Sequence, residues 1–119
     1  MMSLIEQLAS AALERDALKV RSLTQELLRS KTSLTDLDRP TNAHPNVLAV
    51  AAALLELLAS RKHLVAPSWT AEVGAMDRPF FLLDAADRMP RLRAWCEAEA
   101  PEPLRRRGLF APPDFLNDA

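Results

Sequence analysis

The chain has 119 residues and a net charge of −1 at pH 7, with 49% hydrophobic but only 5% aromatic residues. This length suits one domain with a core of its own, and the near-neutral charge argues against a protein that binds nucleic acid or an anionic membrane over its whole surface. Cys96 is the only cysteine, which excludes an intrachain disulfide and a cysteine-rich zinc site. The apolar residues are mostly Leu and Ala, which favour helices, and the two glycines are few for a chain of hairpins. We therefore predict an all-α fold.

The first thirty residues contain no proline or glycine, and apolar residues recur there at helical spacing. The apolar face changes phase at a polar triplet around residue 15, so we predict two helices, over residues 3–14 and 16–30. A single bent helix is the alternative. Ser3 followed by Glu6 is typical of a capping box, and Asp16 is suited to cap the second helix.

A polar connector over residues 31–43 leads to His44-Pro45-Asn46, which opens the most apolar segment of the chain. Proline is favoured in the first turn of a helix, so we predict a helix from there to about Lys62. Its leucines and alanines lie on almost every face, which is typical of a buried central helix. We expect it to pack on the two N-terminal helices as a small helical bundle of three main helices plus short helices.

The pattern changes near residue 67, since seven of the nine prolines lie at or after it. We predict one helical turn over residues 68–74 and a short helix over residues 90–99, with Trp95 and Cys96 on its apolar side.

The apolar run at residues 79–83 is either a strand or an irregular segment packed on the bundle. We favour the second, because no pairing partner is evident in the sequence. Trp69 and Trp95 are expected to anchor this half of the chain on the core, with a role as binding hot spots as the alternative.

Pro101 and Pro103 are expected to end regular helix. The predicted organisation is therefore a helical domain of residues 1–100 followed by an irregular, proline-rich arm of residues 101–119. The arm carries three adjacent arginines and then two apolar pairs with no helical or strand period. We interpret it as a segment that docks on a partner, in cis on its own body, or both.

The residues typical of catalysis are scattered. His44 and His63 would lie roughly 28 Å apart along one helix, too far to share a metal ion. Asp77, Asp84 and Asp87 are interleaved with arginines, which suits ion pairs better than a metal site. We therefore predict no enzyme, no metal and no cofactor. No signal peptide or membrane-spanning run is evident, so we expect a cytoplasmic protein.

A local positive patch remains, because residues 88–107 hold six arginines against three glutamates. Arginine suits bidentate pairing with carboxylate or phosphate. We predict a protein partner bound by the arm, and keep three alternatives: a nucleic-acid-binding accessory protein using this patch, a homodimer closed by the arm, and a solvated charge run. The candidate partner-binding residues are Arg91, Arg93, Arg105, Arg106, Arg107, Leu109, Phe110, Phe115 and Leu116.

The C-terminal residues carry a recognisable pattern: Trp95-Cys96-Glu97, then Pro101-Glu-Pro-Leu-Arg-Arg-Arg-Gly-Leu-Phe110, then Pro112-Pro-Asp-Phe-Leu116. This resembles a group of small uncharacterised bacterial proteins that end in Pro-x-Pro-(Leu/Phe)-Arg-x-Arg-x-(Leu/Ile)-Phe…(Phe/Leu)-Leu-x-x-Ala. The resemblance covers about the last forty residues. The group is associated with toxin–antitoxin operons beside a small nucleotidyltransferase-like partner, which suggests an antitoxin-like protein, and it implies no settled activity. If the partner is such a nucleotidyltransferase, we expect the arginines to occupy and block its carboxylate-lined, metal-binding site.

Overall fold

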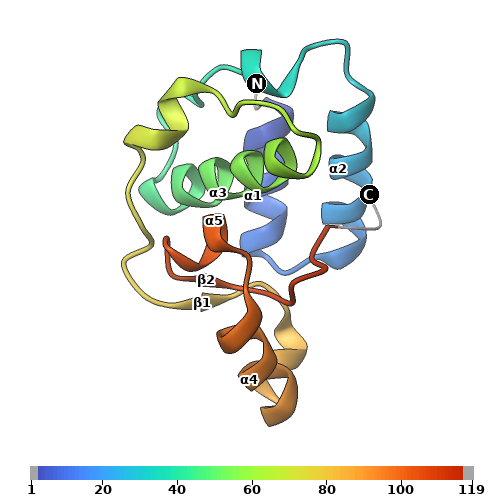
Figure 1. Cartoon of the computed structure of the whole chain (residues 1–119), viewed down its shortest axis with the longest axis vertical. Coiled ribbons are helices and arrows are strands. Elements are labelled where there is room, and N and C mark those ends of the chain that lie inside the picture. Colours follow the sequence, from blue (N-terminus) through green and yellow to red (C-terminus); the bar gives the residue numbers. More distant parts are fainter. Residues whose placement is uncertain (1–2, 117–119) are drawn as a thin grey trace.

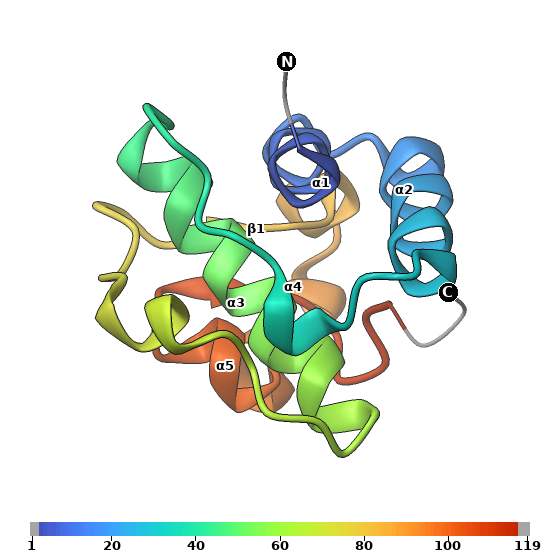
Figure 2. The ribbon, with the colours of Figure 1, turned by 90° about the horizontal axis from the view of Figure 1, so that it is seen from above.

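The computed structural model describes residues 3–116 of the chain (Figure 1). Its three longest helices are α1 (Leu4–Leu13), α2 (Ala17–Arg29) and α3 (Pro45–Arg61). Helices α1 and α2 lie side by side, and α3 crosses α1 on the other side (Figures 1 and 2). The predicted small bundle of three main helices is confirmed.

Local capping explains why α1 and α2 are two helices. The Ser3 hydroxyl accepts a hydrogen bond from the Glu6 amide (3.3 Å), and the Asp16 carboxylate accepts one from the Lys19 amide (3.1 Å). Between them Arg15 adopts a left-handed conformation (φ 58°), and the Asp16 amide donates back to the Ala11 carbonyl (3.1 Å). This is the usual way in which a helix ends at a left-handed residue.

Helix α3 is the buried centre of the fold, as its composition predicts. The His44 ring nitrogen Nδ1 accepts a hydrogen bond from the Asn46 amide (3.0 Å) at its start. Every residue from Ala49 to Ala59 is buried except Glu56. The core around α3 also takes residues from α1 and α2, including Ile5, Leu8 and Leu27.

The second half of the chain consists of short elements. These are η1 (Leu34–Asp36), η2 (Ser68–Glu72), β1 (Phe80–Phe81), η3 (Asp84–Asp87), α4 (Pro90–Glu99), α5 (Glu102–Arg105) and β2 (Leu109–Phe110). Strands β1 and β2 run parallel, with Phe80 opposite Leu109. The Phe80 amide donates to the Gly108 carbonyl (2.8 Å) and the Leu82 amide to the Phe110 carbonyl (2.9 Å). The irregular conformation favoured for residues 79–83 was therefore wrong at Phe80–Phe81, because the pairing strand comes from the end of the chain.

The irregular proline-rich arm is not confirmed. Residues 102–105 form a turn of helix, in which Pro103 is tolerated because the first helical amides need no partner within the helix. Leu104, Leu109 and Ala111 are fully buried in the same core as Ile5 and Leu8. Residues 117–119 of the predicted arm lie outside the described residues. From residue 101 to residue 116 the segment is packed into the body.

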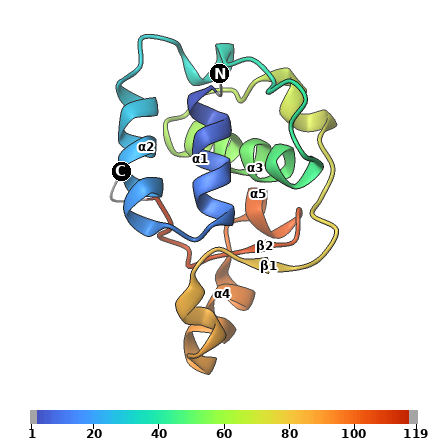
Figure 3. The ribbon, with the colours of Figure 1, turned by 180° about the vertical axis from the view of Figure 1, so that it is seen from behind.

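The two tryptophans have different surroundings. Trp69 is half-buried against the core, as expected, and its Nε1–H donates to the Leu37 carbonyl (2.8 Å). Trp95 is 44% exposed, so the prediction that it anchors this half of the chain on the core was wrong. Helix α4 packs through Cys96 and Leu92 on Phe81, and its body extends away from the bundle (Figures 1 and 3).

Candidate functional site

The three adjacent arginines do not share one environment. Arg107 is buried, and its guanidinium donates to the Glu56 carboxylate with both amino groups, one of them at 3.2 Å from Oε2. The same guanidinium donates to the Thr70 carbonyl (2.7 Å). Arg106 also pairs with Glu56 but is half exposed, while Arg105 is exposed and donates to the Ala98 carbonyl.

Glu56 is therefore the centre of an internal ionic cluster. Burial by itself would raise the pKa of Glu56, but hydrogen bonds from Arg107 and Arg106 outweigh it and hold the pKa below its ordinary value. A largely buried carboxylate with two guanidinium partners stays charged and keeps both arginines in place. We therefore remove Arg107 from the candidate binding surface and assign it to the fold.

The arginines of α4 also differ from each other. Arg93 pairs with Glu97 (3.4 Å) one turn later, and its guanidinium lies over the Phe81 ring, 4.1 Å from the centroid. Arg91 is exposed, and the described residues offer it no ion pair. The predicted patch of residues 88–107 is thus partly engaged inside the protein.

The two apolar pairs of the C-terminal segment also differ from each other in their surroundings. Leu109 is fully buried in the core, and Phe110 stacks on Phe81 with ring centroids 5.2 Å apart. Phe115 and Leu116 are half-buried and line an open cavity of about 240 Å³. Of the four residues, Phe115 and Leu116 are the two that line an open cavity.

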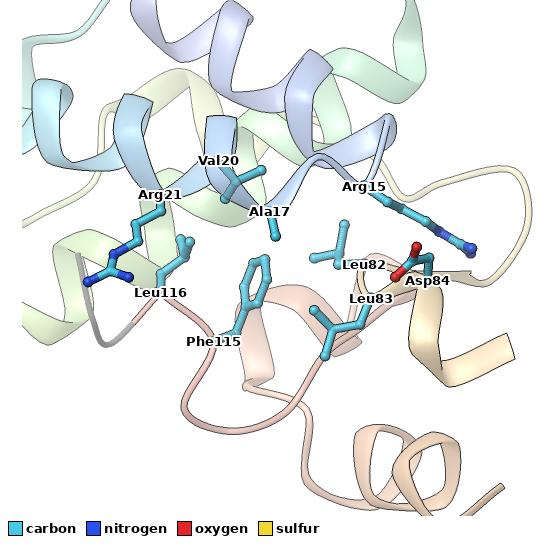
Figure 4. Close-up of a pocket in the computed structure, with 9 residues that line it drawn as sticks. All are labelled: Arg15, Ala17, Val20, Arg21, Leu82, Leu83, Asp84, Phe115 and Leu116. Carbon is cyan, nitrogen blue, oxygen red and sulfur yellow. The ribbon is translucent and has the colours of Figure 1, made fainter. Parts of the chain in front are cut away.

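The cavity lies between the start of α2, the residues that follow β1, and the end of the C-terminal segment (Figure 4). The Phe115 ring stands in its middle and faces Ala17, with Arg21 beside Leu116 at one end and Arg15 with Asp84 at the other. We call it the α2 groove. Six of its nine lining residues are apolar, the full set being Arg15, Ala17, Val20, Arg21, Leu82, Leu83, Asp84, Phe115 and Leu116.

Contacts from α3 and from the turn between α1 and α2 fix the walls of the α2 groove. Arg61, in the last turn of α3, donates to the Pro113 carbonyl (3.1 Å) and to the Phe115 carbonyl. Leu116 has a left-handed backbone (φ 67°), which is rare for a bulky residue and is found where surrounding contacts enforce it. Arg15 forms an ion pair with Asp87 (2.6 Å) and lies over the Phe80 ring. The groove is thus a built feature of the fold.

Reasoning from sequence identified Phe115 and Leu116 but missed the rest of this lining. The α2 residues Ala17, Val20 and Arg21 belong to an ordinary amphipathic helix, so no local signal marks them. In the structure the neighbouring Leu18 is 82% exposed, but the sequence does not show this exposure.

The described residues contain no group of three or more His, Cys, Asp or Glu side chains that could hold a metal ion. Among the helices of residues 3–116, none is long and apolar enough to cross a membrane. Comparison of the chain with protein-family models, with curated proteins and with solved structures returned no match.

Proposed function

We propose that this protein is a non-enzymatic, adaptor-like protein that binds a protein partner by taking an apolar side chain of that partner into the α2 groove. The observation that carries this proposal is the open, mostly apolar cavity formed by α2, residues 82–84 and Phe115–Leu116. The three segments come from distant parts of the sequence and are held by Arg61 and the Arg15–Asp87 ion pair. A site that is formed before binding loses little entropy on association.

The size of the groove suits a single side chain. Its volume of about 240 Å³ lies near the lower end of the range, roughly 300–1,000 Å³, that is usual for sites of small molecules and cofactors. A single large apolar residue fits a space of this kind, and such anchored residues supply much of the affinity at protein interfaces.

The rim of the groove adds a preference for acidic partners at one end. Arg21 is exposed and has no ion pair within residues 3–116, and it lies one helical turn from the exposed Leu18. A partner segment with a carboxylate beside its apolar residue would complement the charge of Arg21 and the apolar surface of Leu18. The resemblance of the C-terminal residues makes a toxin of a toxin–antitoxin pair one partner of this kind.

The proposal is tested by recovering partners from cells of the source organism with the full-length tagged chain. Ala17→Arg places a long charged side chain across the groove, and Ala17 is exposed, so the core is left intact. Ser22→Arg is the matched control, because Ser22 is exposed on the same helix and does not line the groove.

We expect a protein that is recovered by the wild type and by Ser22→Arg and is lost with Ala17→Arg. Equal recovery by all three proteins would contradict the proposal. A nucleic acid recovered in a salt-sensitive manner would instead support the alternative function of the arginine patch.

A further inference from the structure

The outward side of α4 carries an ordered stripe of three residues. Arg91, Trp95 and Glu99 follow one another at intervals of four, which places them on one face of the helix over about 12 Å. All three are exposed, Trp95 to 44%. A positive charge, a large aromatic ring and a negative charge thus stand in a row.

One side of α4 is held by contacts within the chain. Cys96 is fully buried, and Leu92 packs with Phe81 on the same cluster. Arg93 and Glu97 form an ion pair with each other. Neither Arg91 nor Glu99 makes an ion pair within the described part of the chain. The stripe is therefore the free face of this helix.

Helix α4 extends away from the bundle, so its free face is open to another molecule (Figures 1 and 3). Ala94 and Ala98 lie beside the stripe and are exposed. Small residues at these positions allow a second helix to approach closely around Trp95.

We infer that α4 pairs with α4 of a second copy of this chain, antiparallel and centred on Trp95. In this arrangement the two tryptophans meet, Arg91 of one copy faces Glu99 of the other, and the same pair forms again by symmetry. A parallel pair would instead place Arg91 against Arg91 and Glu99 against Glu99. The stripe is thus complementary to a second copy of itself in the antiparallel orientation. A two-fold interface requires such self-complementarity, so the order of charges indicates both the partner and its orientation.

The interface is small, because α4 has ten residues and stable complexes commonly bury about 1,600 Å² in total. We expect a reversible dimer with a dissociation constant of micromolar order or weaker. The stripe shares no residue with the α2 groove, so the test of the dimer is independent of the test of the proposed function.

Sedimentation equilibrium of the full chain tests the inference, with Arg91→Glu and Glu99→Arg measured alone and mixed. Each variant alone brings like charges together twice, and we expect its dimer dissociation constant to rise about tenfold or more. In the equimolar mixture, the stripe of the first variant is negative at both ends and the stripe of the second is positive at both ends. The two variants should therefore form heterodimers at least as tightly as the wild type dimerises. In the otherwise wild-type chain, Trp95→Ala should also raise the dimer dissociation constant.

Arg29→Glu, at an exposed position of α2, is the control for net charge and should leave the dissociation constant unchanged. Circular dichroism checks that each variant is folded. A wild type that stays monomeric at millimolar concentration, single variants that dimerise like the wild type, or a mixture that does not recover association would each overturn the inference.

Discussion

Arg107 and Glu56 form a two-pronged ion pair that joins the turn after α5 to the middle of α3. Their side chains are 5% and 11% exposed, and a further hydrogen bond from Arg107 reaches the carbonyl of Thr70, in the middle of η2. The planar guanidinium suits such a bidentate contact. The pair therefore fixes the C-terminal segment, which in turn supplies β2 and one wall of the α2 groove.

Replacing Arg107 by alanine should lower the free energy of unfolding by about 1.5–3 kcal/mol, because the largely buried Glu56 carboxylate loses its bidentate partner and keeps only the half-exposed Arg106. Arg105→Ala is the matched control: Arg105 is exposed, and its loss should cost less than about 1 kcal/mol. Urea denaturation of both variants measures the difference. Equal effects of the two substitutions would show that Arg107 has no special place in the fold.

Stability should depend on pH through Glu56. Its pKa in the folded protein lies below the ordinary value of 4.5, so its contribution is fully present above that pH and is lost as the pH falls through the folded-state pKa. The difference in unfolding free energy between the wild type and Glu56→Gln should thus stay constant well above pH 4.5 and shrink as the pH falls through 4.5 towards the lower folded-state pKa. Glu26→Gln, at an exposed site of α2, is the control. A difference that stays constant through this fall in pH would contradict this role of Glu56.

A chain that ends at Ala100 should fail to fold. It lacks Leu104, Leu109 and Ala111, which are fully buried in the core, and it lacks Arg107. Burial of each leucine contributes about 1.5–3 kcal/mol, and the whole stability of a small domain is only about 5–15 kcal/mol. We expect no cooperative thermal transition in circular dichroism. A cooperative transition at the wild-type temperature would show instead that residues 101–119 are an independent arm.

The two glycines should respond differently to alanine. Gly108 has a left-handed backbone (φ 77°), and an added Cβ would meet its neighbours only at ordinary contact distances. Gly108→Ala should therefore destabilise the fold by about 1–2 kcal/mol through its backbone conformation alone. Gly74 has no atom near the position of an added Cβ, so Gly74→Ala should be neutral or slightly stabilising. Urea denaturation measures the free energy of unfolding of both variants. Equal changes in the two variants would contradict the need for a left-handed backbone at Gly108.

Helices α1 to α4 could be predicted from the sequence because their signals are local. The caps at Ser3 and Asp16, the proline at position 45 and the apolar periodicity lie within the helices that they define. The β1–β2 pair could not be predicted in this way. Each strand is two residues long, and Phe80 meets Leu109 only after the helices between them have folded back.

The arginine run was misjudged in part for a related reason. Three adjacent arginines are usually solvated or bind a partner, and nothing next to them in the sequence indicates burial. The signal lies far away, in Glu56, which is the only charged residue between Val47 and Ala59. A carboxylate in so apolar a helix needs a cation beside it. The α2 groove depends on the same long-range packing, so only Phe115 and Leu116 could be named beforehand.

The most direct test of the α2 groove is to add the recovered partner to the isotopically labelled chain and follow amide chemical shifts by NMR. We expect the largest changes on Ala17 and Arg21 of α2, on residues 82–84, and on Phe115 and Leu116. Changes confined to Arg105 and Arg106 or to the outer face of α4, with the groove unaffected, would contradict binding in the groove.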